Sequence, residues 1–158
     1  MGQQQLILLV LATVIIGIAI VVGIRAFTEN SAKSNADAMV QEGVRMANDM
    51  QAWKKKPAPF GGQAAVATAA QVADPADFTG FTFPLLGYAA TLGVYTSLNG
   101  TYTISANTAT ETTFQGVNTT EQNTVLVDAC GIADRNIAGA ITVLGGQTAN
   151  AAPTCLPG

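Results

Sequence analysis

The sequence contains no histidine, few charged residues and only two cysteines. Without histidine the chain can form neither a Ser-His nor a Cys-His dyad, and it offers no imidazole to a metal. It also lacks a phosphate-binding loop and a dinucleotide-binding glycine pattern. Two acidic pairs lack the dense spacing of a calcium loop, so we expect them in turns and caps. These pairs are Asp74 with Asp77 and Asp128 with Asp134. The absences predict a protein that is not an enzyme and binds no cofactor or metal.

Charge is divided unevenly along the chain. Residues 1–56 carry six of the seven basic residues, whereas residues 57–158 contain only Arg135 against six acidic residues. An acidic surface repels the phosphate backbone of nucleic acids. We therefore predict that residues 57–158 bind no nucleic acid.

The longest apolar run, Leu6–Ile24, contains no charged residue and a single hydroxyl side chain. Its length of about 19 residues is close to the roughly 20 that a helix needs to cross a bilayer. A helix that is apolar on all faces must be surrounded by lipid or by other apolar helices. Small residues recur four positions apart within it, a spacing typical of close helix contact in an apolar medium. These candidate packing residues are Thr13, Gly17, Ala19 and Gly23.

No proline interrupts the chain between Gln3 and Lys56. We predict one continuous helix of about 80 Å over residues 1–56, with a membrane or filament-core part at 1–26 and an amphipathic part at 27–56. The amphipathic part carries an apolar stripe that can pack on a domain. A ladder of alternating charge on another face is either a solvated face or a set of pairs between subunits. The stripe is Ala36, Met39, Val40, Gly43, Ala47, Met50 and Trp53, and the ladder is Arg25, Glu29, Lys33 and Asp37.

The two cysteines, Cys130 and Cys155, lie in the last third of the chain. Their wide spacing and the lack of histidine do not indicate a zinc site. They form either two separate buried thiols or a disulfide, which would close a loop of about 26 residues and contribute roughly 3–4 kcal/mol. A disulfide would imply export to an oxidising compartment. Asn99 and Asn118 each begin an Asn-X-Thr sequon and are candidate glycosylation sites.

Residues 57–158 predict a small β-rich extracellular head domain. Residues 57–62 form a turn-rich connector, and the alanine-rich segment 63–73 is a candidate short helix. Asp74 and Pro75 either begin another helix, as cap and first helical residue, or form an extended turn.

The strongest local signal in the head is Asn99-Gly100, which predicts a type I′ hairpin turn. The polar segment 107–123 predicts an exposed loop with at most a short edge strand. Together these features predict an α+β fold, in which the long helix covers one face of an antiparallel sheet of about four strands. Strands are expected at 93–98, 101–106, 124–129 and 140–144. Three tyrosines either line a binding surface or pack in the core, namely Tyr88, Tyr95 and Tyr102.

This layout resembles that of the type IV pilins and their relatives. The resemblance rests on the apolar run Leu6–Ile24, the amphipathic continuation Phe27–Lys56 and a β-rich head that holds Cys130 and Cys155. It implies insertion into the cytoplasmic membrane, then assembly by pilus machinery into a homopolymeric filament on the cell surface. The head is rich in Thr and Asn and also looks like archaeal pilins and archaellins, so the resemblance extends to both lineages.

The front end departs from the common bacterial pilin pattern, in which a leader ends in glycine and the fifth mature residue is glutamate. Gly2 and Gln3 form a candidate processing site. Cleavage between them would make Gln3 the first mature residue and Ile7 the fifth. The first carboxylate in the chain is Glu29. We therefore expect the small residues of the apolar run, rather than an early glutamate, to set the register between subunits.

Three functions are consistent with the sequence. The first is a major structural subunit of an extracellular filament for adhesion or motility. The second is a pseudopilin or minor pilin of a secretion or DNA-uptake system, which would be scarce and form no long filaments. The third is a single-pass membrane-anchored binding domain, which would bind its ligand without the apolar run.

Overall fold

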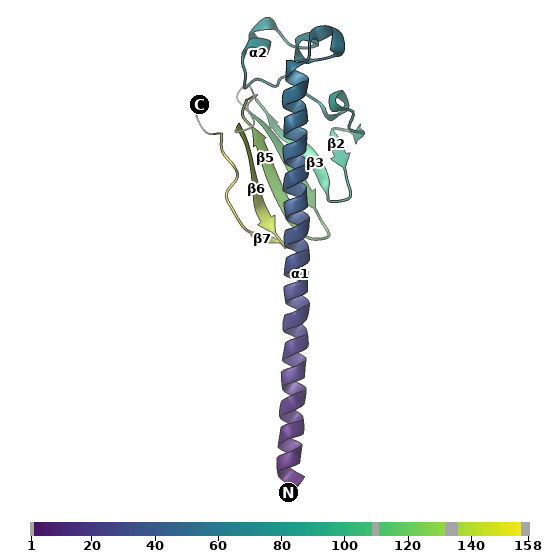
Figure 1. Cartoon of the computed structure of the whole chain (residues 1–158), viewed down its shortest axis with the longest axis vertical. Coiled ribbons are helices and arrows are strands. Elements are labelled where there is room, and N and C mark those ends of the chain that lie inside the picture. The colour runs from purple at the N-terminus through teal and green to yellow at the C-terminus, as the bar shows by residue number, and fades with distance from the viewer. Residues whose placement is uncertain (1, 109–110, 132–135, 156–158) are drawn as a thin grey trace.

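The computed structural model describes residues 2–108, 111–131 and 136–155. It shows one long helix and a seven-stranded antiparallel sheet packed against part of it (Figure 1), which confirms the predicted α+β fold. The strands follow one another in the sheet in chain order, so the sheet is a simple meander. The elements are α1 (Gly2–Lys55), η1 (Ala58–Phe60), η2 (Gln63–Ala65), α2 (Ala69–Ala73), η3 (Phe83–Leu86), β1 (Ala90–Thr91), β2 (Val94–Thr96), β3 (Thr101–Asn107), β4 (Thr112–Asn118), β5 (Asn123–Ala129), β6 (Ile137–Leu144) and β7 (Gln147–Thr148).

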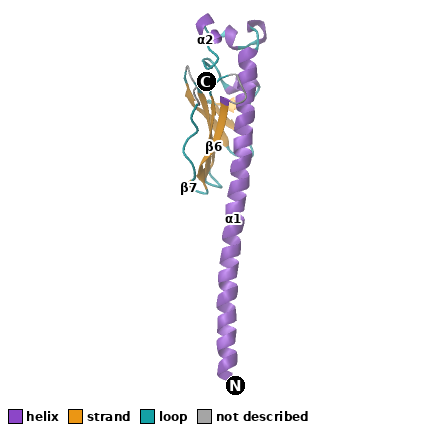
Figure 2. Cartoon of the chain, turned by 60° about the vertical axis from the view of Figure 1, so that its left-hand side comes forward, coloured by secondary structure: helices purple, strands orange, loops and turns teal. Residues whose placement is uncertain are grey.

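Helix α1 is continuous over 54 residues, close to the predicted length. No proline breaks it before Pro57, and the cations of Lys54 and Lys55 suit the negative end of the helix dipole. The sheet packs beside the C-terminal half of α1 only. In Figure 1 and in the turned view of Figure 2, the N-terminal half extends away from the head as a free rod.

The predicted apolar stripe of α1 is the face that packs on the sheet. Ala36, Met39 and Met50 are fully buried, and the helix contacts strands β4, β5 and β6. Val40 lies at the edge of the stripe and is half-buried. The same face also buries residues that the stripe did not include, namely Ala32, Met46, Gln51 and Lys54.

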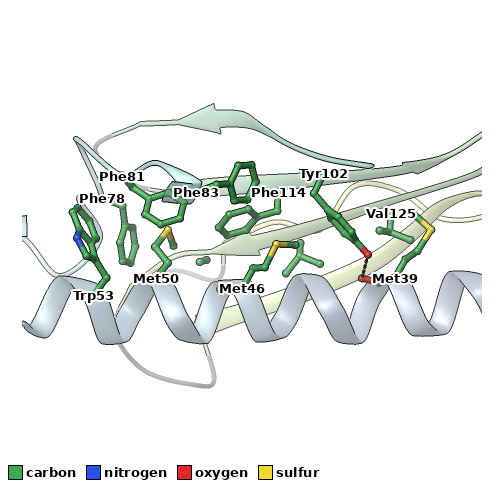
Figure 3. Packing of buried hydrophobic residues seen from close by; sticks show 13 residues of the cluster. Met39, Met46, Met50, Trp53, Phe78, Phe81, Phe83, Tyr102, Phe114 and Val125 are labelled. Carbon is green, nitrogen blue, oxygen red and sulfur yellow. Dashed lines mark hydrogen bonds between the residues drawn. The ribbon is translucent and has the colours of Figure 1, made fainter. Parts of the chain in front are cut away.

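An aromatic cluster fills the space between the sheet and the C-terminal end of α1 (Figure 3). The ring of Phe81 lies edge-on to Trp53 at 5.7 Å and to Phe114 at 5.8 Å between ring centres. Tyr102 is also fully buried, and its hydroxyl donates to the carbonyl of Met39 at 3.2 Å. Each such side chain contributes roughly 1.5–3 kcal/mol by leaving water. For Tyr102 the core-packing interpretation is confirmed.

The prediction of an exposed loop over 107–123 is wrong. The middle of this segment is the seven-residue strand β4, which pairs on both sides and lies within the sheet. Phe114 and Gly116 lie on the face of β4 that packs against α1. The lack of a side chain at Gly116 leaves room for Tyr102 and Met39. The polar residue between them lies on the other face of the sheet. One large apolar side chain was too weak a signal to reveal this alternation.

The hairpin around Asn99-Gly100 exists, but its predicted turn type is wrong. Neither residue has the positive φ that a type I′ turn requires. Instead, a four-residue loop forms in which the Ser97 amide donates to the Gly100 carbonyl at 2.9 Å. Glu42 on α1 accepts hydrogen bonds from the side chains of Ser97 and Asn99, so a tertiary contact overrides the local preference.

Two other hairpins have positive φ at both central residues, as type I′ turns do. They are Leu92-Gly93, with φ of 53° and 80°, and Gly145-Gly146, with φ of 55° and 80°. The first joins β1 to β2 and the second joins β6 to β7. The sheet therefore has seven strands among the described residues rather than about four, because its edges are short hairpins.

The segment 63–73 divides into η2 and α2 instead of forming one helix. Thr68 begins α2 with a capping box, in which Thr68 and Gln71 satisfy each other's backbone amides. Asp74 and Pro75 form a turn, since an Asp74 carboxylate oxygen accepts from the Ala76 amide at 2.9 Å.

Gly43 lets α1 approach β5 closely. A Cβ added there would lie 2.6 Å from Cγ2 of Val127, so Gly43→Val should overpack this interface and lower the free energy of unfolding by roughly 1–3 kcal/mol. Denaturation of the full chain in detergent can be followed by the fluorescence of buried Trp53, its only tryptophan. Gln41→Val, at an exposed position of the same helix, is the matched control. Equal stability of the two variants would contradict the close approach.

Candidate functional site

The candidate site is the projecting segment of α1, residues 2–30, which the head leaves uncovered. Every residue in it is exposed, and the large apolar side chains between Leu6 and Ile24 are 50–66% exposed. An 18-residue window within α1 has a mean hydropathy of 3.2 with none of it buried, so the helix is long and apolar enough to cross a membrane. The apolar run measures about 29 Å, close to the roughly 30 Å of a bilayer core.

Beyond its first turn, the backbone of this segment needs no water. From Leu6 onward its amides donate within the helix, and the Thr13 hydroxyl donates to the Val10 carbonyl at 2.8 Å. The Thr28 hydroxyl donates to the Ile24 carbonyl at 3.0 Å in the same way. Polar groups satisfied within a helix are compatible with an apolar medium. The segment can therefore be enclosed by lipid or by other helices with no orphaned hydroxyl.

The predicted small residues form two separate notches on the projecting segment. Thr13 lies six residues before Ala19, and Gly17 lies six residues before Gly23. Six residues advance a helix by about 600°, so the two pairs face directions about 120° apart. A Cβ added at Gly17 or at Gly23 would meet no atom within 4 Å, so neither glycine serves packing within the chain. The arrangement offers close-contact surfaces toward two different neighbours.

A hydrogen-bonded junction fixes the point at which α1 leaves the head. The Asn123 side chain is fully buried and donates to the Ala32 carbonyl at 2.7 Å. Its oxygen accepts from the Gly145 amide at 2.9 Å. Ser31 donates to Glu121 at 3.3 Å beside it. These contacts hold the helix rigidly against the head at residues 31–32, so the projecting segment is about 43 Å long.

A second junction holds the far end of α1. The Lys54 ammonium group donates to the carbonyl oxygens of Asp74, at 2.5 Å, and of Asp77. Burial lowers the pKa of Lys54, and the nearby carboxylates of Asp77 and Asp74 oppose this effect. No local sequence pattern indicates that Lys54 holds the loop that follows α2, because the contact joins residues that are far apart in the chain.

Cys130 and Cys155 form a disulfide, with their Cα atoms 5.5 Å apart. This confirms the disulfide and excludes the two-thiol alternative. The bridge ties the C-terminal segment to the end of β5. The Glu111 carboxylate lies within 4.8 Å of both sulfurs, but disulfide sulfurs offer no thiolate to a metal.

Asp74 and Asp77 have the turn roles that were predicted, whereas the prediction is wrong for Asp128, which lies within a strand. The Asp77 carboxylate accepts from the Thr79 amide at 2.8 Å, as Asp74 does from Ala76. Asp128 is buried within β5, and Asp134 lies outside the described residues.

The two sequon asparagines lie side by side. The Asn99 amide nitrogen donates to Glu42 at 3.2 Å, and that of Asn118 donates to the Asn99 carbonyl at 2.6 Å. A glycan would be attached to these same nitrogens and would leave each modified nitrogen with a single N–H to donate. Glycosylation at either site stays a prediction.

No protein-family model, curated protein or solved structure matches this chain. The functional interpretation therefore rests on the geometry of the projecting segment and its junction with the head.

Asp128 gives the head a pH-dependent stability. Burial raises the pKa of its carboxyl group, Glu111 adds to this, and a hydrogen bond from Thr113 opposes it. One carboxylate oxygen has no partner within the part of the chain that the structure describes. Because the folded-state pKa is above the unfolded one, this group favours folding in acid and loses that contribution as pH rises through the folded-state pKa.

Asp128→Asn should therefore raise the free energy of unfolding at pH 7 by about 1–2 kcal/mol. The advantage should shrink as the pH falls toward about 4, where the unfolded wild-type carboxyl is also protonated. Denaturant unfolding between pH 4 and pH 8 measures both effects, with the exposed Asp37→Asn as the control. A difference that does not change with pH would contradict the assigned cause.

Proposed function

We propose that this chain is the major structural subunit of an extracellular filament resembling a type IV pilus, which serves adhesion or motility. The observation that carries the proposal is the projecting segment, an apolar helix exposed on every face and held in line with the head. A continuous apolar surface of this extent marks a site that lipid or other apolar helices must cover. In a filament, the same segments of neighbouring copies cover one another.

Two features favour polymerisation over simple anchoring. First, α1 passes from the apolar half to the head without a break, whereas an anchor needs no rigid connection. Second, the two notches face different directions, and an open polymer requires at least two distinct contact surfaces on each subunit. A helix moving from lipid into a bundle exchanges one apolar environment for another, so packing decides the equilibrium.

The proposal places the chain in the cytoplasmic membrane before assembly, with its head on the outer side. Support for this orientation comes from the disulfide, which persists in oxidising compartments. Pilus assembly machinery would then move the subunit from the membrane into the growing filament. The acidic head would face outward along the filament surface.

Replacing Gly17 or Ala19 with tryptophan should reduce filament yield more than tenfold, because a large ring fills the notch that a neighbouring helix needs. Filaments can be sheared from producing cells and counted by negative-stain electron microscopy. The matched control is Phe60→Trp, which exchanges one exposed aromatic ring for another outside the projecting segment. Disulfide formation in each variant reports a folded head.

The wild-type result separates the three functions that the sequence left open. A chain found only as membrane monomers would contradict the filament and favour the membrane-anchored domain. Low abundance with no long filaments would favour a minor pilin. Normal filaments of the tryptophan variants would contradict close packing at the notch.

A further inference from the structure

The charge ladder of α1 has no ion-pair partner in the part of the chain that the structure describes. Arg25, Glu29, Lys33 and Asp37 are all exposed, and each lies four residues after the previous one. This spacing allows ion pairs along a helix. Yet within the described residues the only ion pair is Arg45–Asp49, at 4.0 Å. The four charges are thus available to another molecule.

We propose that this ladder pairs with the ladder of a second copy of this chain, displaced by four residues along the helix axis. The proposal rests on the filament function and adds its register. The principal contact joins Arg25 of one copy to Glu29 of the next. Lys33 of one copy reaches Asp37 of the next in the same manner. Each step corresponds to an axial displacement of about 6 Å.

Charge complementarity selects this displacement among the alternatives. In parallel copies with no displacement, every charge of the ladder lies level with its own like charge. A displacement of eight residues, about 12 Å, again brings like charges level, Arg25 with Lys33 and Glu29 with Asp37. Four residues bring three opposite pairs level, and twelve residues bring only one. The four-residue displacement also keeps most of the apolar runs side by side.

The position of Arg25 makes this pairing necessary when the apolar helices meet. Arg25 follows Ile24 directly and precedes Phe27, which is 77% exposed in the single chain. Covering these apolar side chains with other helices removes the guanidinium group from water. A buried charge is strongly unfavourable unless it is paired. Glu29 is the first carboxylate of the chain, and it is therefore the acidic group that a neighbouring copy presents nearest to this level.

The surroundings of the ladder leave room for a neighbouring helix. Glu29 and Lys33 border an open groove between α1 and the turn after β6, whose other wall includes Leu144 and Gly145. Asp37 borders the next groove along α1 and β6. The ladder thus continues from the projecting segment along an accessible edge of the head. Four residues advance a helix by about 400°, so successive charges are turned by only about 40°.

Charge exchange tests the proposal in producing cells, with filament yield measured after shearing. Arg25→Glu alone and Glu29→Arg alone should each reduce filament yield at least tenfold, because both create like-charge contacts. The fourfold exchange R25E/E29R/K33E/D37R reverses every charge of the ladder and keeps all three pairs opposite, so it should restore the yield to within a few-fold of wild type. Lys55→Glu changes an exposed cation at the far end of α1 by the same amount and should leave the yield unchanged.

Coexpression of the two single variants separates an intermolecular pair from a structural role within one chain. Alternating copies would place the introduced carboxylate of the Arg25→Glu chain against the introduced guanidinium of the Glu29→Arg chain. The mixture should therefore form filaments that neither variant forms alone. Filament reconstruction should show copies that touch through residues 25–37 displaced by about 6 Å along the helix axis.

Wild-type chains that form no filament would overturn the filament function itself. Wild-type filaments accompanied by full yield of Arg25→Glu would overturn the ladder alone. The ladder would also be overturned if neither the fourfold exchange nor the mixture restores filaments, or if contacting copies show no axial displacement.

Discussion

Both halves of the continuous helix α1 carry apolar side chains that must be shielded from water, and the rest of the structure depends on this constraint. The C-terminal half of α1 is covered by its own sheet, through a methionine-rich face and an aromatic cluster that exclude water. The N-terminal half has an apolar surface on all sides and no described element of its own chain to cover it. Because the helix is continuous, whatever covers the N-terminal half also fixes the position of the head.

The two halves of α1 differ in how strictly they determine what can pack against them. The head-facing half combines close approach at Gly43 with hydrogen bonds from Asn123 and Tyr102, so only one sheet fits it. The projecting segment offers branched aliphatic side chains and small notches, which lipid tails and other helices can both accommodate. Under the proposed function, a subunit that leaves the membrane for a filament would benefit from this lack of selectivity. The small-residue notches and the polar residues next to the head then determine which helices can pack against the projecting segment.

Sequence reasoning succeeded where the signal is periodic along the chain. The 3.6-residue pattern of Ala36, Met39 and Met50 predicted which face of α1 is buried, and the apolar run predicted the exposed segment. Sequence reasoning failed where the local structure is determined by a contact between residues that are far apart in the chain. Glu42 captures the loop at Ser97, and Asn123 anchors the helix at Ala32 from 91 residues away. No local pattern indicates such bonds. Strand β4 was missed because Phe114 is the only large apolar side chain on its inner face.

The rigid junction at Ser31 and Ala32 has a consequence for how the surface of an assembly is built. Since neither a loop nor a proline separates the apolar half from the head, the head cannot swivel about α1. In the proposed filament, the direction in which the outer face of the sheet points would be set by the rotation of the enclosed apolar helix. A single inserted residue near the junction would turn that face by about 100°. The surface that such a filament presents would thus depend on residues that lie far from that surface.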